Sequence, residues 1–159
     1  MNDKLAEIIA QLELVPLERE GGMFAQTYAS ADSAPDGGPA ATAIYYLLAD
    51  DAYSHLHRLT GDEIYHFYLG DPVELLELAP DGTSSVTTLG PDILHGQEVQ
   101  HLVRAGVWQG SRLANGGAWA LLGTTMHPGY SDARYEHGNA SDLIALYPER
   151  AEEISALAR

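Results

Sequence analysis

The sequence predicts a mainly β protein of one domain, a barrel or sandwich with a short helix near each end. Its 159 residues fit one domain, and a hydrophobic content of 45% is enough for a core. Turn-forming residues, among them 16 glycines and 8 prolines, recur at a spacing of roughly 8–12 residues. Short segments at that spacing are typical of antiparallel sandwiches and barrels.

The elements follow in order along the chain. A helix is expected over residues 3–13, because Leu5, Ile8, Ile9 and Leu12 repeat at helical spacing. Gly21 and Gly22 then interrupt the chain before a strand-like run over 23–30. After an exposed loop over 31–39, alternating and apolar runs between turns predict strands over residues 41–48, 54–58, 63–69, 73–78, 84–89, 97–103, 108–113 and 118–126.

A second helix is expected from Pro148, because proline suits a first helical turn. Ala151, Ile154 and Leu157 would then share one side of that helix. No linker or repeat divides the chain. The expected organisation is a single domain over 1–159, with an N-terminal helical arm over 1–20, a β barrel over 22–147 and a C-terminal helix over 148–159.

The composition restricts the classes of partner. Eight Lys and Arg against 23 Asp and Glu give a formal net charge of −15. Such a charge repels phosphate backbones and anionic lipids, so neither nucleic acid nor a membrane is expected as a partner. No apolar run is long enough for a transmembrane helix, and the start of the chain lacks the features of a signal peptide. Without cysteines, disulfides are excluded, and we expect a cytoplasmic protein.

The densest group of chemistry-bearing side chains lies between Ser54 and Gly70. His55 and His57 are two positions apart, so in a strand both face the same side. A turn at Gly61 and Asp62 would let Glu63 face the same space. Two imidazoles and a carboxylate suit a divalent metal such as zinc, nickel, iron or manganese. They equally suit an acid–base pair in which Glu63 orients His57, or a polar pocket that only binds a ligand.

Residues outside this stretch are candidates for ligand contact. Trp108 and Gln109 combine an apolar wall with an amide, which suits a planar or sugar-like ligand. Arg58 is a rare positive charge that either binds an anionic group on the ligand or forms a surface salt bridge. Tyr130 is a candidate for the mouth of the barrel, and Glu136 for an inward-pointing carboxylate.

An ordered set of short motifs covers nearly the whole chain. It runs through Gly21-Gly22-Met23-Phe24, Ala43-Ile44-Tyr45-Tyr46-Leu47-Leu48, Asp62-Glu63-Ile64-Tyr65-His66-Phe67-Tyr68, Gly70-Asp71-Pro72, Trp108-Gln109-Gly110 and Pro128-Gly129-Tyr130. In this order the motifs resemble the Cupin_5 family of the cupin superfamily, compact proteins of undefined function. The resemblance implies a double-stranded β-helix, or jelly-roll, barrel of the RmlC-like type, and a homodimer.

The resemblance also implies roles for individual residues. His55, His57, Glu63 and Gly70 are similar to the first cupin motif, and Gln109 occupies the position of the last metal ligand in the second motif. A glutamine oxygen is a weaker ligand than the usual imidazole. Metal-free sugar epimerases of the cupin fold instead use a histidine–acid dyad with a tyrosine, and Tyr65 lies on the same strand face as Glu63.

The expected function is therefore the binding of a small polar ligand, carbohydrate-like or keto, inside the barrel. One form of it is an isomerase or epimerase that uses His57, Glu63 and Tyr65. The alternatives are a metal-dependent enzyme that uses His55, His57, Glu63 and Gln109, and a binding or sensing module without catalysis.

Overall fold

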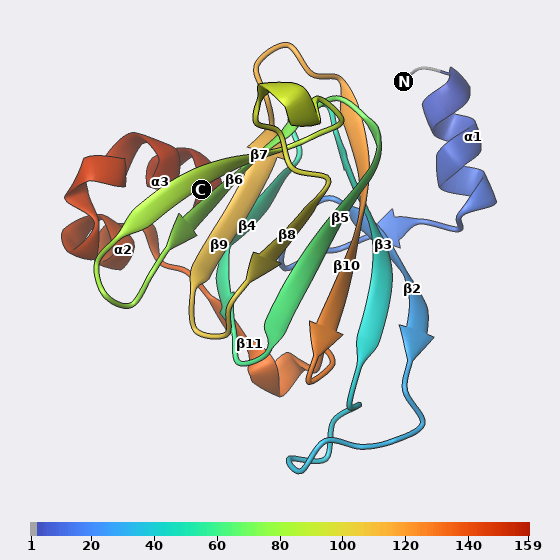
Figure 1. Ribbon diagram of the computed structural model, residues 1–159, viewed down its shortest axis with the longest axis horizontal. Coiled ribbons are helices and arrows are strands. Elements are labelled where there is room, and N and C mark those ends of the chain that lie inside the picture. The colour runs from blue at the N-terminus through green and yellow to red at the C-terminus, as the bar shows by residue number, and fades with distance from the viewer. Residues whose placement is uncertain (1–2) are drawn as a thin grey trace.

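Two antiparallel sheets face each other and enclose the core of the protein (Figure 1). The computed structural model describes residues 3–159, so the first two residues of the expected N-terminal arm lie outside the described part. The strand order is β1-β2-β3-β10-β5-β8 in one sheet and β11-β4-β9-β6-β7 in the other. The mainly β jelly-roll architecture with short terminal helices is thereby confirmed.

The strands agree with those expected, apart from their ends and two short additions. The first sheet contains β1 (Val15–Pro16), β2 (Met23–Ala29), β3 (Thr42–Ala49), β10 (Trp119–His127), β5 (Asp62–Gly70) and β8 (Gln100–Val103). The second sheet contains β11 (Tyr135–His137), β4 (Tyr53–Leu59), β9 (Trp108–Leu113), β6 (Val73–Leu78) and β7 (Ser84–Leu89). The two additions are β1 and β11, which the sequence did not predict because strands of two and three residues are too short to show an alternating pattern.

Helices cover the outer faces of both sheets. Helix α1 (Asp3–Gln11) packs Leu5 against Leu47 and Leu121 on the outside of the first sheet. At the other end of the chain, α2 (Ala140–Leu146) and α3 (Ala151–Leu157) cover the second sheet (Figure 1). Short 3-10 turns are η1 (Ile93–His95), η2 (Asp132–Arg134) and η3 (Pro148–Arg150).

The C-terminal helical region is longer than expected. The helix expected from Pro148 begins as η3 and continues as α3, while α2 precedes it within the expected barrel range. The Asn139 side chain caps α2 by accepting a hydrogen bond of 3.1 Å from the Asp142 N–H. Among residues 3–159, none of the helices has the length and apolar character needed to cross a membrane.

The core lies between the sheets and is built by the alternation of side chains along each strand. On β3, Tyr46 and Leu48 point inward and join the core with Val73, Leu75 and Leu122. Leu47, which lies between them in the sequence, instead faces α1. This alternation also orients the polar side chains of β4, β5 and β9, which lie at one end of the same interior.

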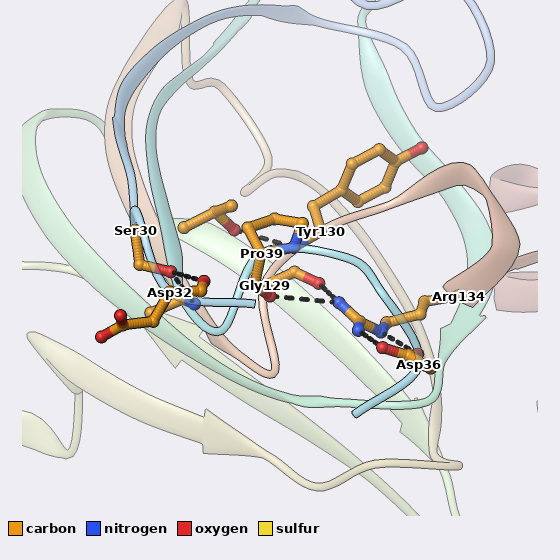
Figure 2. A network of polar contacts seen from close by, with 9 residues as sticks. Ser30, Asp32, Asp36, Pro39, Gly129, Tyr130 and Arg134 are labelled. Carbon is orange, nitrogen blue, oxygen red and sulfur yellow. Dashed lines mark hydrogen bonds and ion pairs between the residues drawn. The ribbon is translucent and has the colours of Figure 1, made fainter. Parts of the chain in front are cut away.

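A clasp centred on Arg134 fixes the loop between β2 and β3. The Arg134 side chain is buried and pairs with Asp36, with an Nε to Oδ2 distance of 2.9 Å, and it also donates to the Gly129 carbonyl (Figure 2). The Tyr130 N–H donates to Thr42 Oγ1 at 2.9 Å. The loop between β2 and β3 is therefore tied to the segment that follows β10, at the end of the barrel where Tyr130 lies.

Candidate active site

A partly enclosed cavity of about 90 Å³ lies inside this end of the barrel. Its walls are largely apolar, but the carboxylates of Glu20 and Glu63 both line it, together with Tyr46, Thr124 and Tyr130. At roughly 30 Å³ per water molecule, the space holds about three waters or the reacting end of a small molecule. Two carboxylates in such a confined and mostly apolar space make it the strongest candidate for a site of chemistry.

Glu63 on β5 is the group most strongly affected by the cavity. Its side chain is buried, and burial is the largest cause that raises its pKa from 4.5 to about 7. The negative charge of Glu20 raises this pKa further, whereas His57 and hydrogen bonds with Thr124 and Tyr65 lower it. A carboxyl group that gains and loses its proton near neutral pH can act as an acid or as a base.

His57 on β4 is held in one tautomer. Its Nδ1 lies 2.7 Å from the carbonyl oxygen of His55, which can only accept a hydrogen bond, so Nδ1 carries the proton. Its Nε2 therefore has the free lone pair, and it faces Glu20 Oε1 at 3.9 Å. The ring is only 1% exposed and stacks on Tyr135, with ring centroids 5.1 Å apart. His57 is thus a second oriented proton acceptor beside Glu63.

The structure does not bring the expected metal ligands together. His55 and His57 both stack on rings of β11, but on different ones, since His55 lies against His137 and His57 against Tyr135. The His55 ring stacks on His137 at 3.7 Å, donates from Nε2 to the Gly138 carbonyl at 3.0 Å, and lines a separate pocket. Across residues 3–159, no group of three or more His, Asp or Glu side chains is arranged to hold a metal ion.

Gln109, the remaining member of that set, is also committed elsewhere. Its carbonyl oxygen, the atom that would bind a metal, accepts a hydrogen bond of 2.8 Å from the Tyr65 hydroxyl. Burial, followed by the charge of Glu63, raises the pKa of Tyr65 well above its usual value of 10. Tyr65 therefore keeps its proton and acts as a donor. His55, His57, Glu63 and Gln109 as arranged do not fit one metal centre.

Three of the expected ligand-binding residues lie outside the barrel. Arg58 pairs with Glu136 at 2.6 Å and lies over the Trp108 ring, 4.6 Å from its centroid. Trp108 itself packs with Leu56 and Leu76 beneath the C-terminal helices. These side chains form a surface cluster, which corresponds to the salt-bridge interpretation of Arg58, and none of them lines the cavity with Glu63.

Tyr130 does line the cavity, and the clasp described above holds its backbone. Its hydroxyl donates to Asp132 Oδ1 at 3.1 Å, and burial together with this contact raises its pKa to about 12. Figure 2 shows its ring projecting from the segment that Arg134 ties to the loop between β2 and β3. The clasp therefore fixes one wall of the cavity.

Glu20 is the functional side chain that sequence reasoning missed. It lies in the turn between β1 and β2, where its Oε1 accepts from Ser54 Oγ at 2.8 Å and its carbonyl accepts from the His55 N–H at 2.7 Å. The next residue, Gly21, has a φ of +97°, and a Cβ there would lie 2.3 Å from the Tyr53 carbonyl oxygen. The sequence feature that could have pointed to Glu20 is the Gly21-Gly22 pair that follows it, because two glycines in a row indicate a tight turn beside an acidic side chain.

Facing antiparallel sheets, with a largely apolar cavity that holds two carboxylates between them, define the class of the protein, a small jelly-roll barrel of the cupin superfamily. The family model described as Cupin superfamily (DUF985) matches residues 6–138, and the chain belongs to this Cupin_5 family, as its motifs indicated. No curated protein sequence matches the chain.

Solved structures agree with this assignment. A protein from Shewanella oneidensis is 30% identical with a TM-score of 0.90, and the match covers 100% of this chain and 98% of that chain. A hypothetical protein from Leishmania major is 28% identical with a TM-score of 0.88, over 96% and 97% of the two chains. A Bacillus subtilis oxalate decarboxylase is 14% identical with a TM-score of 0.56, over 87% of this chain and 36% of that chain, which shows a shared fold alone.

Proposed function

We propose that the chain is an acid–base enzyme, of the isomerase or epimerase type, that acts on a small carbohydrate-like or keto molecule in the barrel cavity. The observation that carries the proposal is the buried Glu63, whose pKa of about 7 lies within reach of neutral pH. The cavity that Glu63 lines has apolar walls that suit the carbon skeleton of a ligand, and hydroxyl-bearing side chains that suit its polar groups.

The proposed chemistry balances without any external reactant. The Glu63 carboxylate takes a proton from the carbon next to a carbonyl group, which leaves an enolate on the substrate and a neutral acid at Glu63. Return of that proton to the neighbouring carbon, while the hydroxyl proton there passes to the carbonyl oxygen, gives an isomer. An epimer forms when a second group, carrying a proton of its own, delivers it to the original carbon from the opposite face, after which exchange with solvent restores both groups. We assign the second proton transfer to His57, which does not line the cavity itself but has its Nε2 3.9 Å from Oε1 of the cavity-lining Glu20.

Tyr65 has a different place in this scheme from the one the resemblance implied. Its hydroxyl donates to Gln109 at 2.8 Å, and its proximity to Glu63 lowers the pKa of that carboxyl group, against the larger effect of burial. We therefore assign Tyr65 and Gln109 to the support of Glu63. Tyr130 is the proposed ligand-contacting tyrosine, because it lines the cavity.

The test is the exchange of carbon-bound hydrogen with deuterium oxide, followed by NMR on hydroxyacetone, glyceraldehyde, erythrulose and common aldoses. We expect catalysed exchange in at least one of these probes and a loss of roughly 10²-fold or more in His57→Gln. His66→Gln is the matched control, because His66 bonds to Thr125 at 3.1 Å on the outer side of the first sheet. Equal exchange in His57→Gln and wild type would contradict the role of His57. Tight binding without exchange would favour a binding module.

We also propose that two copies associate through the outer face of the first sheet. Tyr28, Tyr68, Leu69 and Leu102 are exposed there. Exposed apolar side chains gathered on one sheet are typical of interfaces, and a two-fold axis would bury the same face of both copies. Light scattering after gel filtration should give about twice the chain mass of 17.1 kDa, and Tyr68→Glu should give the monomer. Val86→Glu, on β7 of the other sheet, should leave the dimer intact.

A further inference from the structure

We propose that Glu20 is the positioning residue of this site, whose carboxylate faces His57 Nε2 and keeps a proton on Glu63. The inference rests on the proposed function, in which Glu20 had no part. Three features of the structure carry it: the position of Glu20 between two spaces, its contacts with β4, and its charge beside two proton-transfer groups.

Glu20 lies between the cavity that Glu63 lines and the solvent. Besides the cavity of Glu63, a more open pocket of about 450 Å³ lies at this end of the barrel, lined by Glu18, Arg19, His55 and His137 among others. Of the described residues that line these two spaces, Glu20 alone is common to both. Its side chain is 17% exposed, whereas that of His57 is 1% exposed. Glu20 therefore connects the open pocket with the buried side chains of Glu63 and His57.

Two contacts with β4 hold this carboxylate in place. Ser54 Oγ donates to Oε1 at 2.8 Å, and the His55 N–H donates to the Glu20 carbonyl at 2.7 Å. Both contacts fall where β4 loses its register with β9, between Ser54 and His57. The irregular stretch of β4 thus binds the turn of Glu20 instead of β9, and the same Oε1 faces His57 Nε2 at 3.9 Å.

The charge of Glu20 lies close to both proton-transfer groups. Its Oε1 faces His57 Nε2 at 3.9 Å, and its negative charge adds to the effect of burial in disfavouring the loss of a proton from Glu63. Burial first, and the charge of Glu20 second, raise the pKa of Tyr46 and that of Tyr135, so both stay neutral. Arg19, which lies over the Tyr135 ring with its guanidinium carbon 4.4 Å from the centroid, is the nearby cation on the same turn.

The experiment is a pH titration of the Glu63 side-chain carboxyl by carbon-13 NMR, in the full chain labelled at glutamate, with Glu63→Gln to assign the signal. Glu20→Gln keeps the shape and removes the charge, so the pKa of Glu63 should fall from about 7 toward its ordinary value of 4.5. Glu20→Asp keeps the charge and should leave that pKa near 7. Glu18→Gln is the matched control, because Glu18 lies in the same turn and outer pocket but does not line the cavity.

An unchanged titration of Glu63 in Glu20→Gln would overturn the inference, and so would equal shifts in Glu20→Gln and Glu20→Asp, which would assign the effect to shape. The amide spectrum of each variant shows whether the barrel is intact, and Glu20→Ala, which also removes the charge, provides the measurement if Glu20→Gln does not fold. The titration needs no substrate. A shift in Glu63 without any hydrogen exchange therefore contradicts the proposed function alone, and exchange that depends on His57 without a shift contradicts the role of Glu20 alone.

Discussion

Glu63→Gln is expected to lower catalysed hydrogen exchange by roughly 10²- to 10⁴-fold and at the same time to make the protein more stable above neutral pH. The first effect follows from the loss of the group that accepts the proton. The second follows from the cost of a buried charge, since a glutamine of the same shape has no charge to bury. A loss of activity together with a gain in the free energy of unfolding is the outcome expected of a buried catalytic carboxylate that is held at a cost to stability.

The pH dependence of this effect has a definite sign. The folded-state pKa of Glu63 is about 7 against 4.5 for an ordinary carboxyl, so the folded state keeps its proton longer than the unfolded state. Stability is therefore lost as the pH rises between these two values, by about 3 kcal/mol in total. Urea unfolding of wild type and Glu63→Gln at pH 4 and pH 8 measures the loss, as the part of the pH dependence that is present in wild type and absent in the variant.

Glu152→Gln, on the exposed side of α3, is the control for the removal of a carboxylate. It should change the stability at either pH by less than about 0.5 kcal/mol. A Glu63→Gln variant that is less stable than wild type at pH 8 would show that Glu63 is held by contacts stronger than its cost of burial.

His101→Gln is expected to destabilise the protein at pH 7 by about 1–2 kcal/mol, a value reduced for partial exposure to solvent. His101 on β8 lies between two carboxylates, with Nε2 2.7 Å from Glu77 and Nδ1 2.6 Å from Glu98. These contacts, with Glu77 the largest cause, raise its pKa from 6.5 to about 9. Because Glu77 belongs to β6, the charged imidazole ties the first sheet to the second, and its loss leaves two carboxylates facing each other.

The pH dependence of the stabilisation by His101 follows from its pKa, which is higher in the folded state than in the unfolded state. The stabilisation is fully present below pH 6.5 and disappears as the pH rises through about 9. Thermal unfolding of wild type and His101→Gln should therefore differ at pH 6 and converge near pH 10. The control is His95→Gln, because His95 pairs with Asp92 on the exposed surface and should contribute nothing measurable. A constant difference across this pH range would assign the effect to packing.

The sequence was sufficient for the barrel because its signals are local. The stripe of Leu5, Ile8 and Leu12 and the turn residues between strands each act within a few positions. The site needed information that no local pattern carries. Glu20 comes from an irregular turn, and only the path of the chain around Gly21 brings its carboxylate to His57. The spacing of His55 and His57 predicts which side of a strand they face, but not how deep along the barrel each ring lies.

The clasp of Arg134 and Asp36 has a consequence for how the sequence can drift. Loss of the acid at position 36 leaves a buried guanidinium cation with only carbonyl partners, and loss of the arginine leaves the loop untied. Either change alone damages the wall that carries Tyr130, whereas a joint change to two apolar residues can restore it. Positions 36 and 134 lie far apart in the chain, and we expect them to covary among related sequences, so that a substitution at one accompanies a substitution at the other.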